Sequence, residues 1–106
     1  MSLDAEETRR TGDELRANMA LSTLNVTQVA DDLDWDVGRV ADTLAMSGGQ
    51  DPADVWELRD YLVQAIRDRG EKPVPFTVLT DQGRLQADRW FGLRQAPSHD
   101  WDQHRE

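Results

Sequence analysis

Residues 24–40 read Leu-Asn-Val-Thr-Gln-Val-Ala-Asp-Asp-Leu-Asp-Trp-Asp-Val-Gly-Arg-Val, and this stretch decides the fold that we expect. Apolar and small residues recur at helical spacing on both sides of Asp34-Trp35-Asp36, which is typical of a tight turn between two short helices. Thr27 is a candidate cap for the first helix, and Asp36 is one for the second. Ala30 is small enough to let the two helices cross closely. The pattern therefore predicts a helix-turn-helix unit over residues 26–45.

Each helix of this unit needs one apolar face, because a surface helix buries one stripe of its side chains. The first helix is expected to bury Val29, Ala30 and Leu33. The second is expected to turn four residues inward, namely Val37, Val40, Ala41 and Leu44.

Further helices are predicted on both sides of the unit. Asp4 and Glu7 form a capping pair for a first helix that ends near Leu21. Asp51 followed by Pro52 is the clearest helix start in the chain. The helix that begins there carries a broad apolar stripe and is expected to end at Gly70. With the two helices of the central unit, this makes four predicted helices.

The last third of the chain is less regular. Residues 71–75 must be extended because of their two prolines, and residues 76–79 fit either a short strand or the approach to a helix. A last helix is expected over residues 80–91, with Leu85, Trp90 and Phe91 as its apolar contacts. Residues 96–106 lack periodicity and are expected to form a mobile tail. We therefore predict an all-α protein of about five helices, with one domain over residues 1–95.

Composition excludes several classes of function. The chain has 106 residues and no cysteine, so disulfides, thiol catalysis and thiolate metal sites are absent. Its acidic start and the lack of a long apolar stretch predict a soluble cytoplasmic protein without a membrane segment. The two histidines, His99 and His104, fall in the expected tail beside Asp100 and Asp102, where a preorganised metal site is not expected. We expect no enzyme, no cofactor, no metal and no small-molecule substrate.

The central unit resembles the helix-turn-helix of lambda-repressor-like regulators in its Thr27-Gln28 opening, its small Ala30 and its apolar positions. The resemblance implies DNA binding, with Gln28 on phosphate and with Gly38 and Arg39 near the bases. Two features depart from the family. Asp34 stands where the turn usually has glycine, and residues 27–50 hold five aspartates and a single base.

This acidity disfavours DNA as a partner, because affinity for a duplex comes mainly from lysine and arginine on phosphates. The whole chain carries a net charge of −9. A positive face could form only if folding gathers the scattered bases, among them Arg9, Arg10, Arg16 and Arg59.

The wider layout resembles DUF2316, a family of small uncharacterised bacterial proteins. The resemblance covers residues 1–94 and is carried by the N-terminal Met-Ser-Leu-Asp-Ala-Glu-Glu and by three later segments. These are Asp-Val-Trp-Glu-Leu-Arg-Asp-Tyr-Leu at 54–62, Pro-Phe-Thr-Val-Leu-Thr at 75–80 and Arg-Trp-Phe-Gly-Leu at 89–93. It implies a helical fold and no established activity.

Two functions stay open. One is a regulatory or adaptor module that binds protein, and the other is a DNA-binding transcriptional regulator. Trp35 in the turn and Trp56 off the main stripe of its helix are the two tryptophans most expected to be partly exposed, and exposed tryptophan is enriched at protein interfaces. A homodimer or another protein partner would bury them. The alternative is that they fill the space between helices within the monomer. An acidic mimic that occupies another protein's DNA site also fits the net charge, without specific support.

Overall fold

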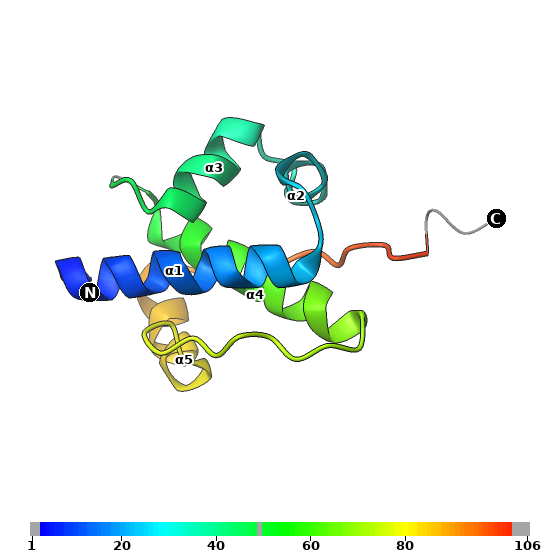
Figure 1. Cartoon of the computed structure of the whole chain (residues 1–106). Helices are drawn as coiled ribbons and strands as arrows, with labels where there is room; N and C mark the ends of the chain where they lie inside the picture. Colours follow the sequence, from blue (N-terminus) through cyan, green and yellow to red (C-terminus); the bar gives the residue numbers. More distant parts are fainter. Residues whose placement is uncertain (1–2, 49, 103–106) are drawn as a thin grey trace.

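The computed structural model describes residues 3–48 and 50–102, and within them the chain is all-helical (Figure 1). α1 and α4 are long and cross each other, α2 and α3 pack together above α1, and α5 lies on the other side. The described residues form five helices and no strand, which confirms the predicted fold class. The helices are α1 (Ala5–Ser22), α2 (Val26–Leu33), α3 (Val37–Ala45), α4 (Pro52–Asp68) and α5 (Asp81–Phe91).

Most helix starts follow the sequence signals. Asp4 and Glu7 form a reciprocal capping box at the start of α1, and Asp51 caps α4 by accepting from the Ala53 amide at 2.9 Å. The predicted cap of α2 is wrong. Asn25 caps this helix, because its side chain already lies next to the free amides when the chain leaves the connector. Thr27, two residues later, is inside the helix and exposed.

The turn between α2 and α3 uses a left-handed residue. Asp34 has φ 59° and ψ 42°, a conformation that aspartate tolerates better than most non-glycine residues. The next amide, that of Trp35, donates to the carbonyl of Ala30 at 3.0 Å and closes the end of α2. Asp36 then caps α3 as predicted, accepting from the Arg39 amide at 2.7 Å.

The core is built around α4, which packs against both α1 and α3. Leu58, Tyr61, Leu62 and Ile66 are fully buried on it, and Leu15 of α1 is fully buried against the same core. Burying each large apolar side chain contributes about 1.5–3 kcal/mol. The broad stripe predicted for this helix is thus the centre of the fold.

Several expected burials are wrong. Val37 is 48% exposed and Ala41 is exposed, because α3 begins at the end of the unit that is farther from α1 (Figure 1). Leu85 and Trp90 are 75% and 66% exposed, since among the apolar residues of α5 only Ala87 is buried and Phe91 is partly buried. These positions share the helical spacing of the core residues, but no neighbouring element lies over them.

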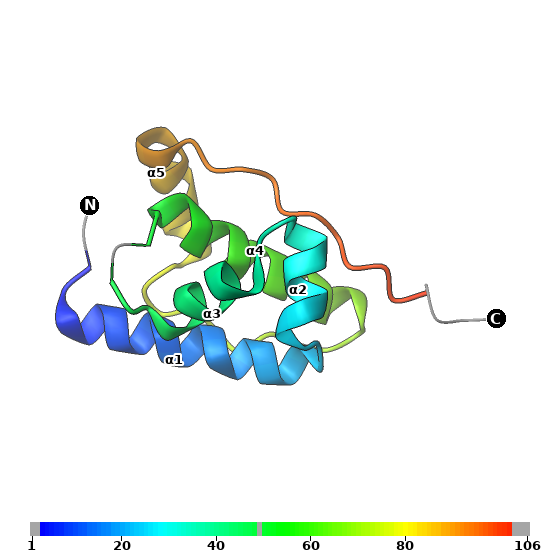
Figure 2. The same cartoon turned by 90° about the horizontal axis from the view of Figure 1, so that it is seen from above.

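Residues 92–102, here called the C-terminal segment, run along α4 and reach α2 (Figure 2). The segment has neither helix nor strand, yet Ala96 and His99 are buried, which the sequence did not predict. The Trp101 indole donates to the carbonyl of Ala65 at 3.0 Å. Mobility of the tail stays a prediction, and His104 lies outside the described residues. In the described part of the chain, no helix has the length and apolarity needed to cross a membrane.

Candidate interaction surface on α2 and α3

The side chain of Trp35 fixes the turn between α2 and α3. It is 9% exposed and belongs to the main apolar core, and Trp56 on α4 is only 4% exposed. The expectation that these two tryptophans are partly exposed is therefore wrong. They are buried because the turn and the start of α4 face the same core. The two side chains are therefore not exposed enough to form a protein interface.

Arg39, the expected base-reading residue, binds within the protein. Its Nε and Nη2 donate to the carboxylate of Asp54 at 2.8 and 2.6 Å, a bidentate pair that joins α3 to α4. Its guanidinium carbon also lies 4.3 Å from the centre of the Trp35 ring, in cation–π geometry. The edge of the guanidinium that carries Nε and Nη2 is thus bonded to Asp54 and one of its faces is stacked on Trp35, so Arg39 joins two helices within the protein.

Asp54 is the centre of a larger cluster. Arg94 from the C-terminal segment donates to the same carboxylate at 2.5 Å, and Arg94 Nε lies 2.8 Å from Oε1 of Glu57. The hydrogen bond from Arg39 lowers the pKa of Asp54 below its ordinary value, against the opposing effect of burial. Burial raises the pKa of Glu57. We call Arg39, Asp54, Glu57 and Arg94 the α3–α4 ion cluster.

Gln28, expected to contact phosphate, also has an internal role. Its Oε1 accepts from the Asn25 amide at 3.0 Å, while the Asn25 side chain accepts from the Gln28 amide at 2.8 Å. The two residues form the capping box of α2. Gly38 is the third expected DNA contact, and it is exposed on α3. The side chains of Gln28 and Arg39 are thus both bonded within the protein, and Gly38 has no side chain with which to contact a base.

Folding pairs the four scattered arginines named above with carboxylates, so none of them stands as a free positive charge. Arg16 donates in addition to the carbonyl of Leu44 at 2.6 Å. The pairs are Arg9 with Glu6 and Asp13, Arg10 with Glu6, Arg16 with Asp13, and Arg59 with Asp60 and Asp81. Their charges are offset where they stand.

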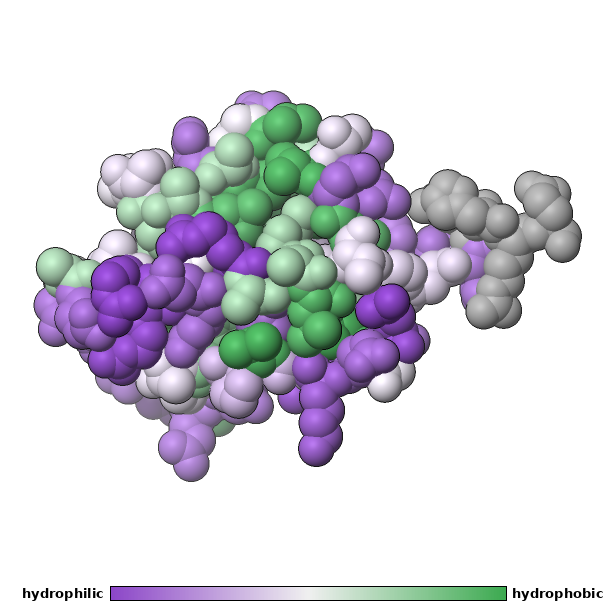
Figure 3. Space-filling view, in the orientation of Figure 1, coloured by the Kyte–Doolittle hydropathy of each residue, from purple (hydrophilic) through white to green (hydrophobic). Residues whose placement is uncertain are grey.

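The exposed surface of α3 has an apolar centre and acidic edges. Val37, Ala41 and Ala45 are exposed and recur every four residues, so they form one stripe along the helix. The exposed side chains of Asp36 and Asp42 lie on the same helix or at its cap. We call these five residues the α3 outer face. Figure 3 shows apolar side chains gathered over the α2–α3 pair with hydrophilic ones on either side.

A second polar cluster holds the C-terminal segment. Tyr61 donates to Oδ2 of Asp32 at 2.5 Å, and Nδ1 of His99 lies 2.6 Å from the same oxygen. The His99 side chain is 3% exposed, and its ring meets Trp101 edge-on at 4.6 Å between centroids. Burial, and then the contact with Asp32, raises the pKa of the Tyr61 hydroxyl. Among the described residues, no group of three or more potential ligands could hold a metal ion.

Sequence reasoning missed both clusters. Asp54 was recognisable only as an acidic residue in the first turn of a helix, where it also suits the helix dipole. Its partners lie 15 and 40 residues away in the chain, and no spacing rule connects them. The same holds for Asp32 and His99, which are 67 residues apart.

Comparison with known proteins gives a family. A family model matches residues 1–92, and it describes DUF2316, an uncharacterised protein conserved in bacteria. No curated protein and no solved structure shows significant similarity, so the kinship with lambda-repressor-like regulators stays a prediction. The matched residues include all five helices and stop at the start of the C-terminal segment. The chain therefore belongs to the DUF2316 family.

Proposed function

We propose that this chain is a regulatory or adaptor module that binds another protein through the α3 outer face and performs no chemistry itself. The observation that supports the proposal most directly is that the guanidinium of Arg39 is engaged in contacts within the protein. It is held by Asp54 and stacked on Trp35, so the helix that would read DNA offers apolar and acidic side chains instead. Such a surface suits the core and rim of a protein interface.

The face also indicates the chemistry of the partner. An apolar side chain would cover Val37 and Ala41, and lysine or arginine around it would approach Asp36 and Asp42. Attraction between opposite charges speeds the encounter and fixes the orientation of the partners. A second copy docked by the same face would bring like charges together, so we favour a basic partner over a homodimer.

DNA reading would require Arg39 to leave two partners. The guanidinium would give up its bidentate bonds to a carboxylate whose side chain is 10% exposed, and that carboxylate would keep only Arg94. Phosphate contacts would also have to form beside aspartates. The proposal therefore predicts no sequence-specific affinity for DNA.

The experiment compares Val37→Arg with Leu85→Arg, a matched change at another exposed apolar residue on α5. Immobilised wild-type chain is incubated with lysate of its host bacterium, and retained proteins are identified by mass spectrometry. We expect a basic partner that is retained by wild type and by Leu85→Arg, is lost from Val37→Arg, and is weakened by salt.

Two results would contradict the proposal. The first is a partner that Val37→Arg retains as well as wild type, or no retained partner from a chain that sediments as a monomer. The second is binding of genomic fragments at low salt that falls steeply with salt and is reduced by Arg39→Ala, which would support the DNA-binding alternative instead. A dimer that Val37→Arg dissociates would make the partner a second copy and overturn the basic-partner assignment.

A further inference from the structure

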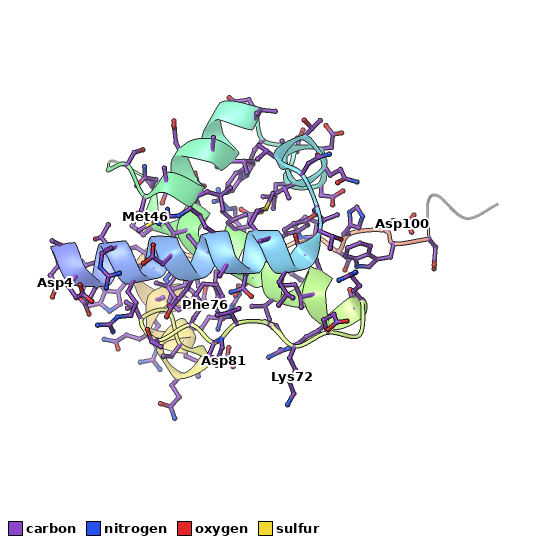
Figure 4. The ribbon with its side chains drawn as sticks, viewed as in Figure 1. Asp4, Met46, Lys72, Phe76, Asp81 and Asp100 are labelled. Carbon is purple, nitrogen blue, oxygen red and sulfur yellow. The ribbon has the colours of Figure 1, made fainter. Side chains whose placement is uncertain are left out.

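A hollow of about 310 Å³ lies where four helices come together at one end of the molecule. Its walls come from the starts of α1 and α4, the ends of α3 and α5, and the segment before α5. Figure 4 labels Met46, which lies on this side of the fold between α3 and α1. The lining residues are Leu3, Thr8, Met46, Gln50, Pro52, Val55, Trp56, Val78, Leu79 and Phe91.

The lining is uncharged throughout, although charged residues make up 31% of the chain. Most of it is aliphatic or aromatic. An ion inside the hollow would lose its hydration without a counter-charge, which costs several kcal/mol. The volume is at the lower end of the range in which proteins bind small organic molecules, about 300–1,000 Å³. The hollow therefore selects a small and neutral occupant.

Polar groups in this wall have hydrogen-bonding capacity to spare. Trp56 as a residue is 4% exposed, and its indole N–H has no hydrogen-bond partner among the described residues. This N–H is not one of the fully buried unpaired atoms, so it keeps some contact with solvent. The same holds for the hydroxyl of Thr8. By contrast, the amide of Gln50 is engaged with Ser47 and Gly48. Because the indole N–H of Trp56 has no protein partner and still reaches solvent, it is available to donate to a bound molecule.

We propose that this hollow binds a small, uncharged, mostly apolar molecule that carries a carbonyl or similar acceptor, and that Trp56 donates a hydrogen bond to that acceptor. Apolar contacts in the hollow supply the affinity. The indole N–H fixes the orientation of the ligand and selects against the corresponding hydrocarbon. The site is separate from the α3 outer face, so it can be tested independently of the proposed partner.

The probes are butyrophenone and butylbenzene, a matched pair that differs by a carbonyl in place of a methylene. Each is titrated into the ¹⁵N-labelled full chain, and the indole N–H signals are followed by NMR. We expect saturable shifts with both probes and a downfield shift of the Trp56 indole proton with the ketone alone. The ketone should bind roughly fivefold more tightly, the ratio that about one net hydrogen bond supplies.

Trp56→Phe keeps an aromatic ring in the wall and removes the donor, so it should abolish the preference for the ketone. Trp101→Phe is the matched control, because it removes an indole N–H that is bonded to the Ala65 carbonyl. The control should keep the preference. Equal affinity of wild type for the two probes, no saturable shift with either, or a preference that survives in Trp56→Phe would overturn the proposal. The wild-type titrations decide the question even if Trp56→Phe folds poorly.

Discussion

Replacing Asp54 with asparagine should destabilise the protein by about 2 kcal/mol at pH 7. Asp54 accepts three charge-assisted hydrogen bonds, two from Arg39 at 2.8 and 2.6 Å and one from Arg94 at 2.5 Å. The two arginine side chains are 39% and 45% exposed, so solvent screens both pairs. We therefore assign each pair about 1 kcal/mol, the upper end of the range for exposed ion pairs.

The assay is urea denaturation followed by tryptophan fluorescence, with a thermal melt as a second measure. A loss of this size should lower the melting temperature by roughly 8 °C in a domain of this length. The slope of unfolding free energy against urea should stay unchanged, because the surface exposed on unfolding is the same. Asp42→Asn is the control, since it removes an exposed carboxylate from α3 and should change stability by less than about 0.5 kcal/mol.

The pH dependence gives the sharper result. The pKa of Asp54 is lowered in the folded state, chiefly by the hydrogen bond from Arg39. A carboxylate of this kind contributes stability that is fully present above its unfolded pKa and is lost as pH falls through the folded one. The difference between wild type and Asp54→Asn should therefore be constant from about pH 7 to pH 5 and shrink only below the ordinary aspartate pKa of 3.8. A difference below about 0.5 kcal/mol at pH 7, or one that persists in acid, would refute this account of the cluster.

Three further predictions follow from individual contacts. Asn25→Ala should cost about 1 kcal/mol in urea denaturation because it removes the cap of α2, whereas Thr27→Ala should be nearly neutral; the reverse order would restore the cap suggested by the sequence. Tyr61→Phe should cost about 1 kcal/mol by removing the bond to Asp32, and an unchanged midpoint would mean that this bond contributes nothing. His99→Ala should speed tryptic cleavage of the C-terminal segment by about tenfold, equivalent to ~1.4 kcal/mol of docking energy, and equal cleavage rates would argue against that docking.

The sequence predicted the helices well, because local signals place them. The Asp4 and Glu7 pair, the Asp36 cap, and the Asp51-Pro52 start all act within one helical turn. Thr27 was the exception. Two residues of similar capping ability, Asn25 and Thr27, stand close together, and only the path of the chain out of α1 decides between them.

The candidate site was predicted less well. The acidity of the surface formed by α2 and α3 could be predicted from the sequence, and so could its single basic residue. That Arg39 is held by Asp54 could not be predicted, because the carboxylate comes from another helix. The exposure of Val37 was misjudged for a related reason: helical spacing says which residues share a face, but not whether anything covers its end.

Local sequence signals were enough to show that this chain is helical, where most of its helices begin, and that residues 27–50 are poor in positive charge. These properties depend on residues within a few positions of one another. The packing of the helices determines which charges are paired, which tryptophans are buried, and that a neutral hollow with an unpaired indole lies at one end. Those outcomes depend on side chains that are distant in the chain, and their pairing is fixed only when α4 packs against the elements around it.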